Sequence, residues 1–168
     1  MSAAQTLVSV EQYLQLSAKP AYEYLDGELR QKPMPAFLHS YVQRMLILVL
    51  GRLGFIALPE LTVPVTATRF LVPDVAIVEP METDYPTKPA LLCVEILSPR
   101  DRLGAALAKS EEYHAWGVPY CWVIDPVKQT AGTYHAQEDP LKIERGGTLP
   151  AGQIAVQLSE LFPILNSL

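Results

Sequence analysis

The stretch Leu91-Leu-Cys-Val-Glu-Ile-Leu97 carries the strongest strand signal in the chain, and the neighbouring segments are arranged around it. Six of its seven residues are apolar, which is typical of a strand buried on both faces of a sheet. A helix is expected from about Arg102 to Trp116, with Gly117 as its end. Residues 119–125 are a second apolar strand. Because strand, helix and strand follow one another with short links, we expect a right-handed parallel crossover.

Upstream of this unit, the sequence predicts a hairpin and a long helix. Ser9-Val-Glu-Gln12 has the form of a capping box and predicts the start of a short helix. Within residues 22–30, Asp26-Gly27 lies between two strand-like flanks, which is a strong signal for a two-residue hairpin turn. Apolar residues recur at helical spacing through residues 36–53 and predict a helix there. Residues 55–78 break into short extended pieces.

The last third of the chain has the pattern of a meander. Residues 130–135, 141–145 and 154–158 are predicted strands, and Leu161-Phe162 is expected to pack a terminal turn against the body. The chain shows no internal repeat, low-complexity tract or linker, and its 168 residues suit one domain. We therefore expect a single domain over residues 1–168, of α/β class, with a mixed sheet flanked by helices.

The composition excludes several classes of protein. Apolar residues make up 49% of the chain and charged residues only 18%, so the sequence is not that of a disordered tail. The net charge of -5 counts against a protein that coats DNA non-specifically, although a local basic groove remains compatible with it. No Walker-type phosphate loop and no G-x-S-x-G elbow occur, and the three histidines lack zinc-ligand spacing.

The cysteines and the N-terminus indicate a cytoplasmic protein. Cys93 and Cys121 each lie in an apolar run, so we expect two reduced, buried thiols, and the absence of a C-x-x-C pair excludes a zinc ribbon. The first residues lack the basic and apolar regions of a signal peptide. The longest apolar stretch, Met45 to Leu50, is far too short to cross a membrane.

Two carboxylates in strand-like runs are the first candidates for a functional site. Glu95 lies in the middle of the apolar run, where an unpaired charge costs several kcal/mol, so it needs a cationic partner, a hydrogen-bond network or a metal ion. Asp74 follows Pro73 at the start of another apolar strand. Neighbouring strands would place the two acids side by side, and like charges at that distance favour a hard cation such as Mg²⁺. Alternatively, Glu95 has a purely structural ion pair, and Asp74 only begins its strand.

Lys109 is the candidate cation of the predicted helix. It shares a helix face with Tyr113 and Trp116, at offsets of four and seven residues. Because this face is partly apolar, the lysine stem can run along packed surface with its ammonium held inward. The alternative is an ordinary solvated lysine.

The chain contains an ordered set of motifs: Tyr22-Glu-Tyr-Leu-Asp-Gly-Glu-Leu29 followed by His39, Pro73-Asp-Val-Ala-Ile-Val78, Val94-Glu-Ile-Leu-Ser-Pro-Arg-Asp-Arg102, and Lys109 with Tyr113 and Gly117-Val-Pro-Tyr-Cys-Trp-Val-Ile-Asp-Pro126. In these motifs the chain resembles, from about Tyr13 to Phe162, the Uma-type restriction endonuclease family of the PD-(D/E)XK nuclease superfamily. This resemblance implies a restriction endonuclease-like core, a mixed sheet flanked by helices.

The resemblance also implies a metal-and-lysine site. Asp74 and Glu95 match the two metal-binding acids, and Lys109 matches the lysine that this family takes from the following helix. The wider superfamily commonly has its lysine two residues after the second acid, where this chain has Leu97. The resemblance further implies that Glu28 and His39 line the same cleft; the alternatives are a solvated hairpin carboxylate and an ordinary histidine near the start of a helix. Separately, Arg69, Arg100 and Arg102 lie near the two acids in the sequence, so they are candidate contacts to DNA phosphates. The alternative for each is an ordinary surface arginine.

The activity implied is Mg²⁺-dependent hydrolysis of DNA phosphodiester bonds by an endodeoxyribonuclease, with Mn²⁺ as a substitute and one or two ions on Asp74 and Glu95. Lys109 is expected to stay protonated beside two carboxylates and to stabilise charge on the phosphate rather than act as a base. A homodimer would suit a double-strand cutter. The competing hypotheses are a degenerate nuclease-fold module that binds nucleic acid or a protein without cutting, and an interaction protein that self-associates through the helix around residues 45–50.

Overall fold

The computed structural model describes residues 7–135 and 138–163. Its centre is the predicted crossover: β7 (Leu92–Ile96) and β8 (Tyr120–Asp125) are adjacent and parallel, and α3 (Leu103–Trp116) connects them. The helix ends at Gly117, which has a φ of 116° and where an added Cβ would lie 2.9 Å from Cγ of Pro89. A glycine is required there because L side chains rarely adopt this conformation.

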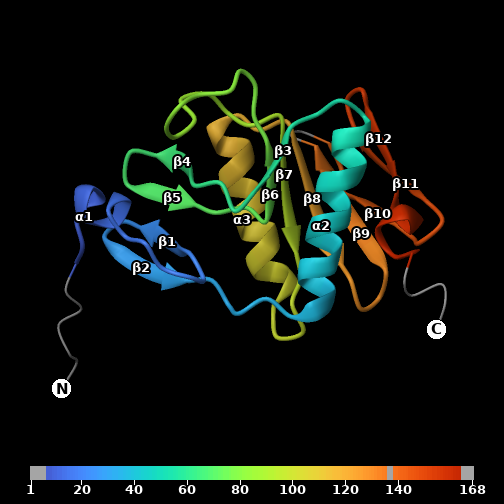
Figure 1. Ribbon diagram of the computed structural model, residues 1–168, viewed down its shortest axis with the longest axis horizontal. Helices are drawn as coiled ribbons and strands as arrows, with labels where there is room; N and C mark the ends of the chain where they lie inside the picture. Colours follow the sequence, from blue (N-terminus) through green and yellow to red (C-terminus); the bar gives the residue numbers. More distant parts are fainter. Residues whose placement is uncertain (1–6, 136–137, 164–168) are drawn as a thin grey trace.

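Strands on both sides of this unit complete a mixed six-stranded sheet (Figure 1). The strand order is β10-β9-β8-β7-β6-β3, and every pair except β7 with β8 is antiparallel. This confirms the predicted mixed α/β class. The further strands of the sheet are β3 (Ala57–Pro59), β6 (Val75–Ile77), β9 (Thr130–His135) and β10 (Leu141–Ile143).

A second, four-stranded antiparallel sheet carries the predicted hairpin, in the order β2-β1-β5-β4. Asp26 and Gly27 have φ values of 53° and 99° and form the turn, as expected for a two-residue hairpin loop. The strands are β1 (Tyr22–Leu25), β2 (Glu28–Gln31), β4 (Val63–Thr66) and β5 (Arg69–Leu71). The short α1 (Val10–Leu14) begins with the predicted capping box at Ser9.

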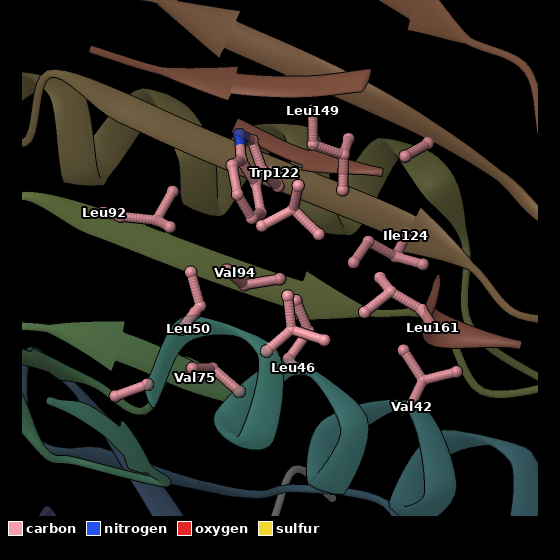
Figure 2. Close-up of a cluster of buried hydrophobic side chains, with 14 of the residues drawn as sticks. Val42, Leu46, Leu50, Val75, Leu92, Val94, Trp122, Ile124, Leu149 and Leu161 are labelled. Carbon is pink, nitrogen blue, oxygen red and sulfur yellow. The ribbon is translucent and has the colours of Figure 1, made fainter. Parts of the chain in front are cut away.

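One face of the six-stranded sheet is covered by α2 (Phe37–Arg52) (Figure 2). Leu46 and Leu50 of this helix pack against Val94 and Trp122 of the central strands, and all four side chains are fully buried. The core thus accounts for the buried apolar face of this helix, whereas Phe37 and Leu48 are exposed. The same cluster includes the C-terminal hairpin β11 (Thr148–Ala151) and β12 (Ile154–Gln157), followed by the 3-10 turn η1 (Leu158–Leu161).

Replacing Leu46, which has no exposed surface, with Ala is expected to lower the free energy of unfolding by about 2–5 kcal/mol, because it removes buried surface and leaves a cavity. Leu48 lies on the same helix but is 47% exposed, so Leu48→Ala is the matched control. Denaturant unfolding of both variants checks the difference. Equal losses in the two variants would contradict the packing described here.

The opposite face of the sheet meets α3 and the smaller sheet. Side chains alternate along a strand, so Leu92, Val94 and Ile96 point toward α2, whereas Cys93 belongs to the cluster that contains Tyr113 of α3. Glu95 shares the orientation of Cys93 and therefore faces α3. Side chains alternate in β6 as well. Val75 and Ile77 point toward α2, so Asp74, which directly precedes Val75, faces the α3 side.

Other expectations from the sequence have mixed outcomes. Cys93 and Cys121 are free, buried thiols, as predicted, although they are register partners in β7 and β8.

The sequence pattern does not predict strand β11, because Pro150 interrupts the strand signal. The two-stranded sheet of β11 and β12 tolerates this proline. The predicted strand over 141–145 ends earlier, at Ile143. No helix within the described residues is long and apolar enough to cross a membrane.

Candidate active site

Asp74 and Glu95 lie on neighbouring strands of the large sheet and face the same side. Asp74 directly precedes β6, and Glu95 belongs to β7, which pairs with β6 through Val75 and Val94. Both carboxylates are buried, with only 2% and 8% of the residue surface exposed. The predicted side-by-side placement of two buried acids is therefore present in the fold.

Three groups hold the Asp74 carboxylate. The Lys32 ammonium lies 2.6 Å from Oδ1, and Nε2 of His39 lies 3.2 Å from the same oxygen. The backbone N–H of Ile96 donates to Oδ2 at 2.7 Å. Burial alone would raise the pKa of Asp74, but the hydrogen bonds and charges of His39 and Lys32 outweigh it and hold that pKa well below its ordinary value. Asp74 is therefore an ionised carboxylate at neutral pH.

Glu95 accepts contacts from α3, as its orientation requires. The Tyr113 hydroxyl donates to Oε1 at 2.6 Å, and Nζ of Lys109 lies 2.8 Å from that oxygen. Burial raises the pKa of Glu95 more than the nearby Lys109 ammonium lowers it. The pKa of the Tyr113 hydroxyl is also raised, by its burial and by the adjacent Glu95 charge, so this group is a hydrogen-bond donor at neutral pH.

Lys109 bridges two acids. Its Nζ is 2.8 Å from Glu95 and 2.7 Å from Oε1 of Glu23, a β1 residue that is itself 5% exposed. Glu23 Oε1 is held by the backbone N–H of Val72 at 3.1 Å. Burial disfavours the Lys109 ammonium, but Glu95 and Glu23 more than compensate and raise its pKa above the ordinary value. A protonated lysine, as expected from the sequence, thus reaches the second acid, Glu95, from α3. Leu97, which stands where the wider superfamily commonly has its lysine, is half-buried.

The buried network of the site consists of Glu23, Lys32, His39, Asp74, Glu95 and Lys109. Two of these residues, Glu23 and Lys32, are not predicted from the sequence. Glu23 lies between two tyrosines in a hairpin strand, where the alternating pattern suggests an outward-facing carboxylate. Lys32 follows the end of β2 and has no apolar neighbours that would indicate burial. Neither carries a local sequence signal for the site, because both reach it only through the packing of the smaller sheet against the larger one.

A cavity of about 590 Å³ lies between the two sheets and α3, and the network lines it. Glu28 and His39 both line this cavity, Glu28 with an exposed side chain and His39 with a buried one. The further members of the network that line it are Glu23, Lys32, Asp74, Glu95 and Lys109.

The three arginines suggested as phosphate contacts differ in position. Arg102 is exposed and lines the cavity, whereas Arg100 is exposed and is not among the lining residues. Arg69 lines the cavity, but two carboxylates already bind it: Glu112 through two contacts of 2.8 Å, and Asp26 at 2.7 Å. Its position therefore favours a structural ion pair at the rim, and Arg102 is the better placed of the three to meet an anion.

The carboxylates of the site fit a hard divalent ion that keeps several of its bound water molecules. Within residues 7–135 and 138–163, no group of three or more His, Cys, Asp or Glu side chains forms a ready-made metal site. Mg²⁺, however, commonly binds one or two carboxylates and completes its shell with water and substrate phosphate. Asp74 and Glu95 supply those carboxylates on the wall of an open cavity, so the residues present are compatible with such an ion.

Comparison with known proteins places the chain in a family. The model of the family Uma2, described as "Putative restriction endonuclease", matches residues 10–163. The fold is similar to a crystal structure of a putative nuclease from Anabaena variabilis, with a TM-score of 0.76 and 24% identity over 92% of this chain and 97% of that chain. No curated protein matches the chain. Because the family model spans nearly all of the described fold, including every member of the buried network, the chain belongs to the Uma2 family of restriction endonuclease-like proteins.

Proposed function

We propose that the protein is a Mg²⁺-dependent endodeoxyribonuclease that hydrolyses phosphodiester bonds in DNA. The observation that carries this proposal is the set of Asp74, Glu95 and Lys109 on one cavity wall. Two buried acids on adjacent strands can hold a metal ion for phosphodiester hydrolysis, and a protonated lysine beside them can stabilise charge on the phosphate. The family to which the chain belongs gives the same expectation.

The roles of the side chains follow from their charge and position. Asp74 and Glu95 would hold Mg²⁺, which, when bound, lowers the pKa of a water and offsets the charge that builds on the phosphate. Lys109 remains protonated beside Glu95 and Glu23, so it stabilises negative charge on the phosphate and orients the attacking water rather than removing its proton. Tyr113 fixes the rotamer of Glu95 by donating to Oε1.

DNA would enter through the open side of the cavity, where Arg102 and the exposed Glu28 lie. The net charge of -5 makes broad attraction to DNA weak, so binding would depend on local contacts near the site. We further propose a homodimer, since two active sites related by a two-fold axis can cut both strands of a duplex.

The proposed function is tested with supercoiled plasmid and purified protein. We expect nicked and linear DNA in the presence of Mg²⁺ or Mn²⁺ and no cleavage in excess chelator. A variant with Ala at both Asp74 and Glu95, purified in parallel, controls for contaminating nucleases. Cleavage by this double variant at the wild-type rate would show that the activity does not come from this site.

One observation favours the second candidate, a nuclease-fold module that binds nucleic acid or a protein without cutting. Asp74 already has Lys32 as a partner and Glu95 has Lys109, so both acids are paired in the absence of a metal ion. Metal titration separates the two candidates. The non-catalytic module predicts no Mg²⁺ or Mn²⁺ binding that depends on Asp74, whereas the nuclease predicts binding that Asp74→Asn removes.

A further inference from the structure

We propose that Lys32 is an internal counter-ion of Asp74, and that a divalent cation binds to the site by displacing the Lys32 ammonium. This inference rests on the proposed metal dependence of the enzyme. Nζ of Lys32 lies 2.6 Å from Oδ1 of Asp74, and only 11% and 3% of the two side chains are exposed.

The Asp74 carboxylate has little room for an additional cation. Oδ2 accepts the backbone N–H of Ile96, and Oδ1 has contacts with both Lys32 and His39. Mg²⁺ binds carboxylate oxygens at about 2.0–2.1 Å, so an ion on Asp74 and an ammonium on the same carboxylate would lie within a few ångströms of each other. Two positive charges that close repel strongly where little water screens them. The ion and the Lys32 ammonium therefore compete for Asp74.

Lys32 is the partner that can leave. Its backbone is anchored because its N–H donates to the carbonyl of Ala21 at 2.9 Å. Within the part of the chain that the structure describes, Nζ has one other hydrogen bond, to the carbonyl of Val72 at 2.8 Å. Lysine has a flexible four-carbon stem, and the residue lines the cavity, so its ammonium can move into that space without a change in the backbone. His39 is held differently, since its ring is buried within the first turns of α2.

The second lysine of the site is in a different position. Lys109 lies between two buried carboxylates, Glu95 and Glu23, so a cation that takes one contact leaves the other in place. Lys32 has a single carboxylate partner among the described residues. The two lysines therefore have separate roles: Lys109 remains at the reaction centre, and Lys32 exchanges with the metal.

The test is Mn²⁺ binding to the DNA-free protein, measured by titration calorimetry. Removing the competitor in Lys32→Met is expected to lower the apparent Kd for Mn²⁺ by about tenfold or more, because the apparent affinity is reduced by the fraction of time the site is occupied by the lysine. Arg102→Met is the matched control: it removes a cavity-lining positive charge that has no contact with Asp74, and it should leave the Kd nearly unchanged. Lys32→Gln replaces Lys32→Met if the latter does not fold.

The outcomes separate this inference from the proposed function. Tighter binding in Lys32→Met but not in Arg102→Met supports displacement, including the case in which only the Lys32 variant binds Mn²⁺ measurably. An unchanged or weaker affinity, or an equal gain in both variants, overturns it. If the wild type binds Mn²⁺ through Asp74 while Lys32→Met shows no gain, the metal site stands and the inference fails. If no variant binds Mn²⁺, both proposals fail.

Discussion

Asp74→Asn is expected to lower Mg²⁺-dependent DNA cleavage on the order of 1,000-fold, since loss of metal-assisted charge stabilisation removes several kcal/mol of transition-state stabilisation. Asparagine keeps the shape of the side chain and an oxygen for the Ile96 N–H, but it loses the negative charge that a divalent cation needs. The measurement is the initial rate of plasmid nicking at saturating Mg²⁺, with a thermal melt of each protein to verify that it is folded.

Glu60→Gln is the matched control for this prediction. Glu60 also lines the cavity, but its only ion pair among the described residues is with the exposed Lys19, at 3.3 Å. Losing its charge should therefore change the cleavage rate little. A folded Asp74→Asn protein that cuts as fast as the wild type would remove Asp74 from the reaction.

Lys109→Met is expected to destabilise the fold by about 3–5 kcal/mol at pH 7, because removing one member of a buried ion network leaves the others uncompensated. In this variant Glu23 and Glu95, both buried, would lose the ammonium that lies 2.7 and 2.8 Å from them. Denaturant unfolding measures the loss. Lys128→Met is the surface control, since that lysine side chain is 77% exposed and its Asp125 contact is 3.4 Å long.

The stability lost in Lys109→Met should be greater at high pH than at low pH. Burial already raises the pKa of Glu95 above its ordinary value, and the lost Lys109 charge would raise it further. Between the ordinary and the raised pKa the native state binds more protons than the unfolded state, so stability decreases as pH rises through that window. The deficit of Lys109→Met relative to wild type should therefore be smaller at pH 5 than at pH 8.

A second substitution checks this explanation. Glu23→Gln in the Lys109→Met background removes one of the two uncompensated charges and should recover part of the lost stability. No recovery in the double variant, together with a deficit independent of pH, would indicate that the loss comes from packing of the lysine stem instead.

The parts of the fold that the sequence predicts are those with local causes. The apolar run of β7, the glycine that ends α3 and the Asp26-Gly27 turn each depend on neighbours within a few residues, and each has the predicted structure. The hairpin strand β11 was not predicted, because Pro150 suppresses the strand signal and the partner strand that compensates for it is known only from the pairing.

The residues of the candidate site also fall into two groups, those with a local sequence signal and those without one. Glu95 was identified by the cost of a carboxylate within an apolar run, and Asp74 by its position at the start of a neighbouring strand. For Lys109, the helix spacing left open whether the ammonium points inward, and the structure shows that it does. Glu23 and Lys32 have ordinary sequence surroundings, and the chain gives no local reason to bury them.

By itself, the sequence determined most of the strands and helices and which carboxylate needs a partner, because hydrophobic periodicity and the cost of burying a charge act over short distances along the chain. Only the tertiary structure decided which groups are those partners. The smaller sheet and the segment after β2 bring Glu23 and Lys32 to the site at β6 and β7, where Lys32 pairs with Asp74 and Lys109 pairs with both Glu23 and Glu95. Such pairings arise from the packing of distant segments, and no local pattern encodes them.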